Sequence, residues 1–268
     1  RGESILLPFL WMVSSSLKTS QEVFSVPMKW LPENPVWKNF QEIWTKIPLL
    51  LFFKNSFKLA IIITALQVLT SSFAAYPFAK MKFPGKDLIF LCYIATIAVP
   101  WQVYMVPQFI LIRKMQLADT HLSLILMQAF TAFGVFLMRQ SYLSVPNELS
   151  EAARIDGCGE FKIMYRIAIP LCVPTIATLC LFYAVGRWNG IDDQLYYVQK
   201  TGLHTVQMAL KQMIEAVNVQ SEESGTTQLV AENIKAASIT LSMTPMLVVY
   251  PFIQRFFTQG IMLGAVKG

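Results

Sequence analysis

Five apolar segments recur along this sequence, and each is long enough to cross the hydrocarbon core of a lipid bilayer. They cover residues 57–79, 88–112, 122–138, 167–185 and 234–257. A membrane-spanning helix needs about 20 mainly apolar residues, because the hydrocarbon core is about 30 Å thick. We therefore expect an all-α protein solvated by lipid. Prolines inside several segments fit this expectation, since neighbouring helices or cavities satisfy the freed backbone groups.

The composition excludes several other classes of protein. Of the 268 residues, 54% are apolar and 14% are charged, whereas soluble domains carry about 25% charged residues. The net charge is +6, but the lysines and arginines stand singly between apolar runs, so we expect no nucleic-acid partner. The four cysteines lack the close spacing of metal sites, and we predict neither a metal centre nor a disulfide framework.

The opening apolar stretch, residues 5–13, is too short to span alone, and we predict that it belongs to a truncated first membrane helix. The predicted protein is a single polytopic domain, residues 1–268, with six transmembrane helices. The predicted spans are approximately residues 1–16, 57–79, 88–112, 122–143, 167–187 and 233–257. The predicted connections include outer loops at 17–56 and 188–232 and a charged loop at 144–166. Lys and Arg in the short loops favour a cytoplasmic position for 80–86, 139–166 and the C-terminal tail, although 17–56 carries lysines on the opposite side.

The charged loop has the pattern of a compact helix-turn-helix. Pro146 is suited to open a helix and Asn147 to cap it. Glu148 and Glu151 fall in the first turn, where the helix dipole favours carboxylates. Gly157 is suited to the left-handed conformation that ends a helix. A second short helix, 160–166, is expected to run into the next span at Pro170.

One face of the first helix is predicted to be a docking surface. Leu149, Ala152, Ala153 and Asp156 lie close together on a helix of this register. The small alanine side chains would allow another backbone to approach closely. A rigid helical knob of this kind is able to transmit a push from another subunit, which a flexible loop cannot do.

The spacing of this loop resembles the EAA motif, in which Gly follows after three residues and Ile-x-Leu-Pro after nine more, that marks permeases of ATP-binding-cassette importers. The sequence departs from it once, with Ile169 where the family usually has Leu. The resemblance implies a type I importer permease fold with a cytoplasmic coupling helix-turn-helix at 144–166. The coupling residues predicted on this basis are Glu151, Ala152, Ala153, Asp156, Gly157, Ile167 and Pro170.

The resemblance extends over nearly the whole chain and is weakest in residues 188–232. Residues 8–18, 99–102 and 259–268 are similar to the MalG-type sugar permeases. The resemblance to such permeases implies import of a sugar, in this case an oligosaccharide, across the bacterial cytoplasmic membrane. The implied partners are a second related permease, two ATPase subunits and an extracellular or periplasmic binding protein. ATP and Mg would bind to the ATPases, so no cofactor is expected here, and Leu263, Gly264 and Lys267 would lie against them.

A polar and aromatic group in the third span is a candidate for the substrate path. Trp101, Gln102 and Tyr104 lie between two prolines, and Gln128 is a weaker candidate of the same kind. Aromatic faces stack on pyranose rings and amides bond to hydroxyl groups. The alternative is packing against the partner permease, where Gln and Tyr side chains hydrogen-bond between helices.

Three other functions remain to be weighed. An importer permease for an amino acid, peptide or phosphate would share the coupling loop. An ion-coupled secondary transporter would need charges inside a span and internal repeats, and the sequence shows no convincing example of either. An intramembrane enzyme would need a reactive constellation at membrane depth, and we identify no catalytic residue. No phosphate-binding loop of the GxxxxGK[ST] type occurs, so any ATPase must be a separate chain.

Overall fold

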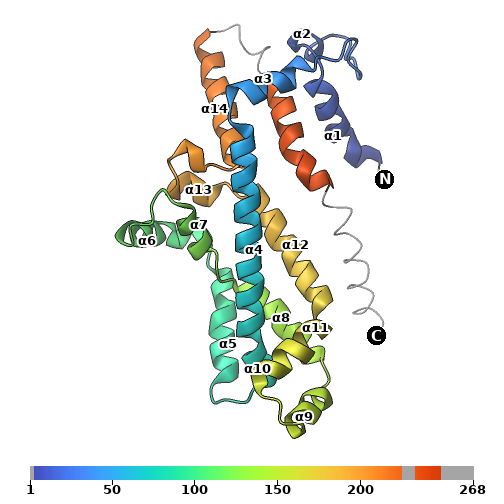
Figure 1. Ribbon diagram of the computed structural model, residues 1–268. Coiled ribbons are helices and arrows are strands. Elements are labelled where there is room, and N and C mark those ends of the chain that lie inside the picture. The colour runs from blue at the N-terminus through green and yellow to red at the C-terminus, as the bar shows by residue number, and fades with distance from the viewer. Residues whose placement is uncertain (1–2, 225–232, 249–268) are drawn as a thin grey trace. The chain divides into compact units, whose positions relative to one another are not determined.

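The computed structural model describes residues 3–224 and 233–248, and every regular element in these ranges is helical. Figure 1 shows the course of the chain. The all-α prediction is confirmed for these residues. The chain packs as two compact units: one contains residues 1–56 and 200–250, and the other contains residues 57–199. The single polytopic domain stays a prediction.

The first unit contains much of what the sequence predicted as outer loops. Its elements are α1 (Glu3–Ser16), α2 (Ser20–Val23), α3 (Lys38–Lys46), the start of α4 (Leu49–Lys80), η3 (Thr201–Leu203), α14 (Val206–Ser224) and the helical residues 233–248. Helix α4 thus begins before residue 57, the start of the second predicted span. The predicted outer loops therefore contain regular helices, which a polar composition alone does not reveal.

Buried carboxamides tie the irregular segments of this unit together. The Asn39 Nδ2 donates to the carbonyl oxygens of Ser16 at 2.9 Å and Lys18 at 3.0 Å. The Asn55 Nδ2 donates to the carbonyls of Gly202 at 2.9 Å and His204 at 3.0 Å. Each amide satisfies two loop carbonyls that would otherwise be buried without a partner, which is costly.

The second unit is a bundle built around α4. Its further elements are α5 (Lys86–Ala95), η1 (Thr96–Ala98), α6 (Trp101–Lys114), α7 (His121–Met127), α8 (Ala132–Ser144), α9 (Asn147–Ile155), α10 (Glu160–Ile163), the π-helical η2 (Met164–Ala168), α11 (Ile169–Leu171), α12 (Val173–Asn189) and α13 (Asp192–Tyr197). In Figure 1, α5, α8 and α12 lie along α4. Helices α9 and α10 lie at one end of this group, and α6, α7 and α13 lie at the other.

Several predicted spans are broken helices. Among the described residues, α4 alone is long and apolar enough to cross a membrane, and up to four spans result if each bent helix pair counts as one. The bend is 98° between α5–η1 and α6, 46° between α7 and α8, and 78° between α10–α11 and α12. The sequence predicted one span each at 88–112, 122–143 and 167–187, with the first interrupted by Pro100 and Pro107. Proline explains the first break, because Pro100 lacks the backbone N–H that would continue the helix. The count of six spans stays a prediction.

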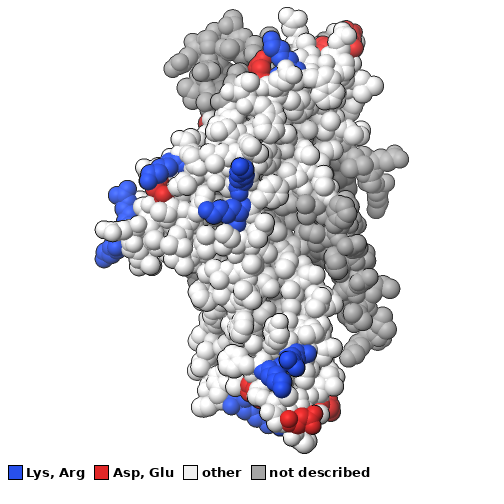
Figure 2. Space-filling model, viewed as in Figure 1, with Lys and Arg blue, Asp and Glu red and all other residues white. Residues whose placement is uncertain are grey.

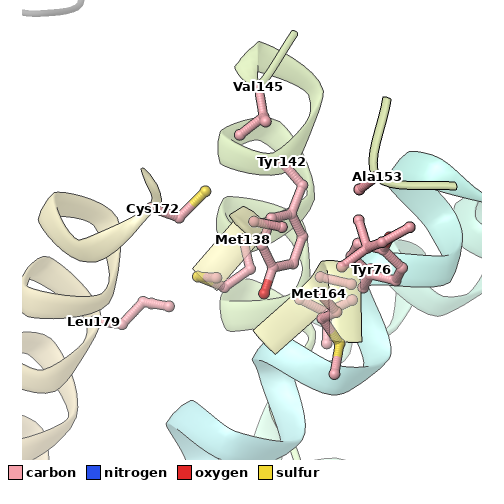
Figure 3. Close-up of a cluster of buried hydrophobic side chains, with 12 residues drawn as sticks. Tyr76, Met138, Tyr142, Val145, Ala153, Met164, Cys172 and Leu179 are labelled. Atoms are coloured by element: carbon pink, nitrogen blue, oxygen red, sulfur yellow. The ribbon is translucent and has the colours of Figure 1, made fainter. Parts of the chain in front are cut away.

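The hydrophobic core of the second unit joins α4 and α8 to the helices that follow α8. Met138 and Tyr142 of α8 are fully buried at its centre, beside Met164 and Ala153. Figure 3 shows these side chains, from α8, α9 and η2, converging on one another. The Tyr142 ring meets the Tyr76 ring edge-on at 5.7 Å between centroids. This packing holds the predicted coupling loop against the bundle.

Charge is segregated along the second unit. On the face in Figure 2, charged side chains gather at the end where α9 and α10 lie. The surface over the middle of α4 and the adjoining part of α5 is uncharged on this face. Large apolar side chains of α5 are exposed, including Leu88 at 66% and Leu91 at 64%. An uncharged, apolar exterior of this kind is suited to lipid or to another membrane subunit.

Gly134 allows α8 to approach two neighbouring helices closely. A Cβ atom at this position would overlap the hydroxyl oxygens of Ser71 on α4 and Tyr183 on α12. These two hydroxyl groups lie 3.4 Å apart and share a hydrogen bond. Small residues at such crossings permit tight helix packing inside membranes.

We expect Gly134→Ala to destabilise the protein by about 1–3 kcal/mol, because the added methyl group overpacks the crossing. Gly186→Ala is the matched control, since Gly186 on α12 has no atom within 4 Å of an added Cβ. Alanine favours a helix interior over glycine, so the control should be neutral or slightly stabilising. Thermal unfolding of the two variants in detergent measures the difference, and equal melting temperatures would contradict the close approach.

Candidate functional site

The predicted helix-turn-helix is present, and we call residues 147–171 the knob. Its first helix, α9, ends at Gly157, which has a φ of +78°. The Gly157 N–H donates to the Arg154 carbonyl at 3.0 Å, and the Cys158 N–H donates to the Ala153 carbonyl at 2.9 Å. This pair of bonds is the Schellman motif, which favours glycine because the left-handed conformation strains other residues. The predicted role of Gly157 as the helix stop is therefore confirmed.

The start of α9 differs from the prediction. Pro146 occupies the N-cap position, and no side chain caps the helix there. Asn147 is the first helical residue, and its Oδ1 accepts a hydrogen bond from Lys80 Nζ at 2.8 Å. The same ammonium group donates to the Val145 carbonyl at 2.6 Å. The carboxamide predicted to cap α9 instead binds the knob to the end of α4.

Glu160 is the second link between the knob and α4. Its Oε2 accepts a hydrogen bond from Tyr76 Oη at 2.9 Å, and its Oε1 accepts one from Arg154 Nε at 2.7 Å. The hydrogen bond from Arg154 holds the pKa of the Glu160 carboxyl below its usual value. The same bond raises the pKa of the Arg154 guanidinium. The two short helices of the knob are thus joined to each other and to α4 through one carboxylate.

The two alanines of the motif face in different directions. Ala153 is 8% exposed and packs into the core of its own chain, so its small size serves α9 packing internally. Ala152 is exposed, together with Glu151, Asp156 and Gly157. The prediction that both alanines share an outward docking face is therefore wrong for Ala153. The reason is that Ala153 lies on the side of α9 that packs against the core of the second unit.

The knob also exposes apolar side chains that the sequence analysis did not single out. Ile155 is 88% exposed and Phe161 is 78% exposed. Tyr165 is also exposed, at 70%, and Leu149, which the sequence analysis placed on the docking face, is exposed at 44%. A patch of large apolar side chains beside exposed carboxylates is typical of a surface that binds another protein. The signal in the sequence was the apolar character of these positions in an otherwise charged loop.

Ile167 and Pro170 lie on the arm of the knob that leads into α12. This arm is helical from Glu160 to Leu171, with a π-helical stretch over Met164–Ala168. A wider π turn accommodates the proline that follows, because Pro170 has no N–H and its ring crowds the preceding turn. The chain then bends by 78° into α12. Ile167 is half-buried and Pro170 is exposed.

A cavity of about 590 Å³ lies in the second unit where two helices are broken. Thr96 and Val99 line it from the break between α5 and α6, and Gln128 and Thr131 line it from the break between α7 and α8. The Ala129 carbonyl within the second break accepts a hydrogen bond from Thr70 Oγ1 of α4 at 2.7 Å. The volume is within the usual range of small-molecule pockets.

Three of the four predicted substrate-path residues line this cavity. They are Trp101, Tyr104 and Gln128. Gln102 is exposed and is not among the lining residues, because it lies on another face of α6. Helical register separates adjacent positions in this way. The alternative of packing against a partner permease stays open for Gln102.

An ion pair beside the cavity was missed by the sequence analysis. Asp193 of α13 lines the cavity, and its Oδ2 lies 2.5 Å from Arg187 Nη1. Gln128 Nε2 donates to the same oxygen at 2.7 Å. The Arg187 side chain is 2% exposed and the Asp193 side chain is 12% exposed. Arg187 ends the predicted fifth span and Asp193 lies in a predicted outer loop, so neither was recognised as a buried charge.

The other predicted site residues, Leu263, Gly264 and Lys267, lie outside the described residues. Their predicted contact with an ATPase therefore stays a prediction.

A family model described as a binding-protein-dependent transport system inner membrane component matches residues 67–263. Protein LplC of Bacillus subtilis is 31% identical, with 100% of this chain and 91% of that protein covered. The polygalacturonan/rhamnogalacturonan transport system permease protein YtcP of Bacillus subtilis is 30% identical, with 98% and 93% covered. A crystal structure of a bacterial ABC transporter involved in the import of alginate, an acidic polysaccharide, has a similar fold. Its TM-score is 0.84 at 24% identity, over 96% of this chain and 92% of that chain.

Glu160→Gln should loosen the knob by about 1 kcal/mol, since a partly exposed charged hydrogen bond is screened by solvent. Because folding lowers the pKa of Glu160, its contribution is present above the unfolded pKa and is lost as pH falls through the folded pKa. Hydrogen exchange of residues 158–168 should therefore be faster in the variant at pH 7, and the difference should shrink as the pH falls through the lowered folded pKa. Glu148→Gln, at an exposed position on the same knob, is the control. An equal effect of both substitutions would refute the link through Glu160.

Proposed function

Because the chain belongs to the family of binding-protein-dependent transport system inner membrane components, we propose that it is the permease subunit of an ATP-driven importer of a carbohydrate, most simply an oligosaccharide. The observation that carries this proposal is the cavity at the two helix breaks, with aromatic rings and carboxamides in its wall. Trp101 and Tyr104 offer ring faces, and Gln67 and Gln128 offer amides. The names of the relatives support the same class of substrate, since YtcP is a polygalacturonan/rhamnogalacturonan permease.

The knob is the proposed coupling element. Glu151, Ala152 and Asp156 would contact a separate ATPase subunit through the exposed face of α9, with Ile155 and Phe161 as apolar anchors. Ala153, Ile167 and Pro170 would act indirectly, by setting the packing and direction of the knob. ATP and Mg would be bound by the ATPases, since this sequence has no phosphate-binding loop.

Rigidity supports this assignment. Lys80 and Tyr76 of α4 hydrogen-bond to the knob, and Ala153 is buried in the shared core. A displacement of the knob would therefore be passed to α4 instead of being absorbed within the loop. This is the mechanical requirement for ATP binding in one subunit to change the access of a pathway in another.

The remaining partners follow from the type of transporter proposed. A second related permease would complete the pathway as a heterodimer, and two ATPases would dock below. A solute-binding protein would deliver the sugar to the outer side, where residues 188–232 would contact it. Leu263, Gly264 and Lys267 would add a further ATPase contact. The chain would cross the bacterial cytoplasmic membrane six times, with the knob in the cytoplasm.

Gly157→Val should uncouple ATP hydrolysis from uptake, because a β-branched residue is strained at a φ of +78° and distorts the end of α9. Uptake per ATP hydrolysed should fall about tenfold in reconstituted transporter. Gly159→Val is the control, since Gly159 has an extended backbone and no atom within 4 Å of an added Cβ. Glu151→Ala should uncouple in the same direction without altering membrane insertion. Normal coupling in both Gly157→Val and Glu151→Ala would refute the docking role.

Trp101→Ala should weaken transport through loss of the aromatic surface in the cavity. We expect the KM for uptake to rise about tenfold, as is usual for removal of a central aromatic contact, while ATPase binding is unchanged. Gln102→Ala is the matched neighbour, because Gln102 does not line the cavity. Uptake kinetics in proteoliposomes distinguish the two, and an unchanged KM for Trp101→Ala would remove the cavity from the substrate path.

A further inference from the structure

The cavity wall has an unusual balance of charge for a site that is proposed to bind a transported solute. Among the lining residues in the described part of the chain, Asp193 is the single member of the Asp, Glu, Lys and Arg group. Arg187, whose guanidinium bonds to Asp193, does not line the cavity and has a side chain that is 2% exposed. The carboxylate therefore faces the cavity, and the positive charge that balances it lies behind.

We propose that the cavity selects an uncharged saccharide and that Asp193 is the specificity-determining residue that accepts its hydroxyl groups. This inference rests on the carbohydrate-transport function proposed above and names the substrate class within it.

The ion pair removes any preference for a charged solute. Asp193 and Arg187 sum to zero charge, so the pair has no net charge with which to attract a distant anion or cation, and only the carboxylate acts at short range. An ionised uronate would meet the Asp193 carboxylate first, and like charges repel strongly in a site of low dielectric. A cation would find a carboxylate already neutralised by Arg187 and bonded by Gln128.

The carboxylate favours a solute that is rich in hydroxyl groups. An ionised carboxylate has only acceptor sites, and it pairs with donors in short, charge-assisted hydrogen bonds. The other polar groups around it are neutral: the carboxamides of Gln67 and Gln128 and the hydroxyl of Tyr104. Trp101 adds a large ring face. Neutral donors and acceptors beside aromatic faces match a saccharide ring that carries no charge.

Arg187 supplies the competing possibility. Its Nε and Nη2 atoms are buried and make no hydrogen bond within the described structure. An acidic sugar that displaced Asp193 would find these donors, and the site would then prefer uronates. The first possibility predicts tighter binding of the neutral saccharide, and the second predicts tighter binding of the uronate. A comparison of the two affinities therefore distinguishes them.

The test compares saccharides that differ only in oxidation at C6: galactobiose with digalacturonate, cellobiose with its diuronate and mannobiose with dimannuronate. Binding is measured on the permease pair in nanodiscs, without the solute-binding protein. The signal is the ligand-induced change in Trp101 fluorescence, which the Trp101→Phe variant lacks. Uptake of the same panel is measured in proteoliposomes with the complete transporter. We expect at least one neutral member to bind about tenfold or more tightly than its uronate.

Asp193→Asn should weaken binding of the neutral saccharide about tenfold. It should also reduce the ratio of the affinities for the neutral saccharide and its uronate within each pair. Asp192→Asn is the matched control, because Asp192 is the adjacent carboxylate on α13 but is exposed and does not line the cavity. Asp193→Asn alone leaves the buried guanidinium without a counter-charge and is at risk of misfolding. The double variant Arg187→Met/Asp193→Asn removes both charges, and it should fold and show the same narrowed discrimination.

Tighter binding of the uronates, or discrimination that persists unchanged in the double variant, would overturn the inference while leaving carbohydrate transport intact. Failure of every saccharide in both the binding and the uptake measurements would instead refute the proposed function, and this inference with it.

Discussion

Backbone hydrogen bonding in a medium without water is the constraint on which this structure depends. In lipid, an irregular segment is tolerated only where it is buried in protein or lines a cavity. The breaks at 99–100 and 128–131 meet this condition, because both line one cavity and Thr70 satisfies the Ala129 carbonyl. The place where the helices break and the place where a solute could be held are thus the same for one physical reason.

The knob meets a different requirement, which is rigidity. It contains a Schellman turn, a carboxylate that accepts hydrogen bonds from two donors, and a buried core face. Each of these restricts backbone or side-chain motions that an irregular loop would have. Its exposed apolar side chains are costly for an isolated chain and suit a surface that another subunit covers. A rigid element with an unsatisfied outer face is what transmission of force between subunits requires.

The sequence predicted the existence of these features better than their geometry. Gly157 and the helix-turn-helix were predictable because a helix stop is local and depends on one residue in one conformation. The orientation of Ala153 was not, since the core behind α9 also includes residues of α4, which is far away in sequence. The interruption at Pro100 was visible in the sequence, but the size of the bend was not, because hydropathy does not report the direction of the chain after a break. Asp193 was missed for a related reason: its partner Arg187 is on another helix, and burial of that pair depends on α13 folding back.

Helix α4 relates the two regions to each other. Gln67 lines the cavity, Thr70 binds the α7–α8 break, and Tyr76 and Lys80 bind the knob, all on one continuous helix. Gln67 and Lys80 are 13 positions apart, which corresponds to about 20 Å of helix at the standard rise. The helices beside α4 are bent at the cavity or at the knob, so they would absorb part of any displacement at the bend. An intact helix has no such joint, and it is therefore the shortest stiff connection between the surface offered to a partner and the cavity offered to a solute.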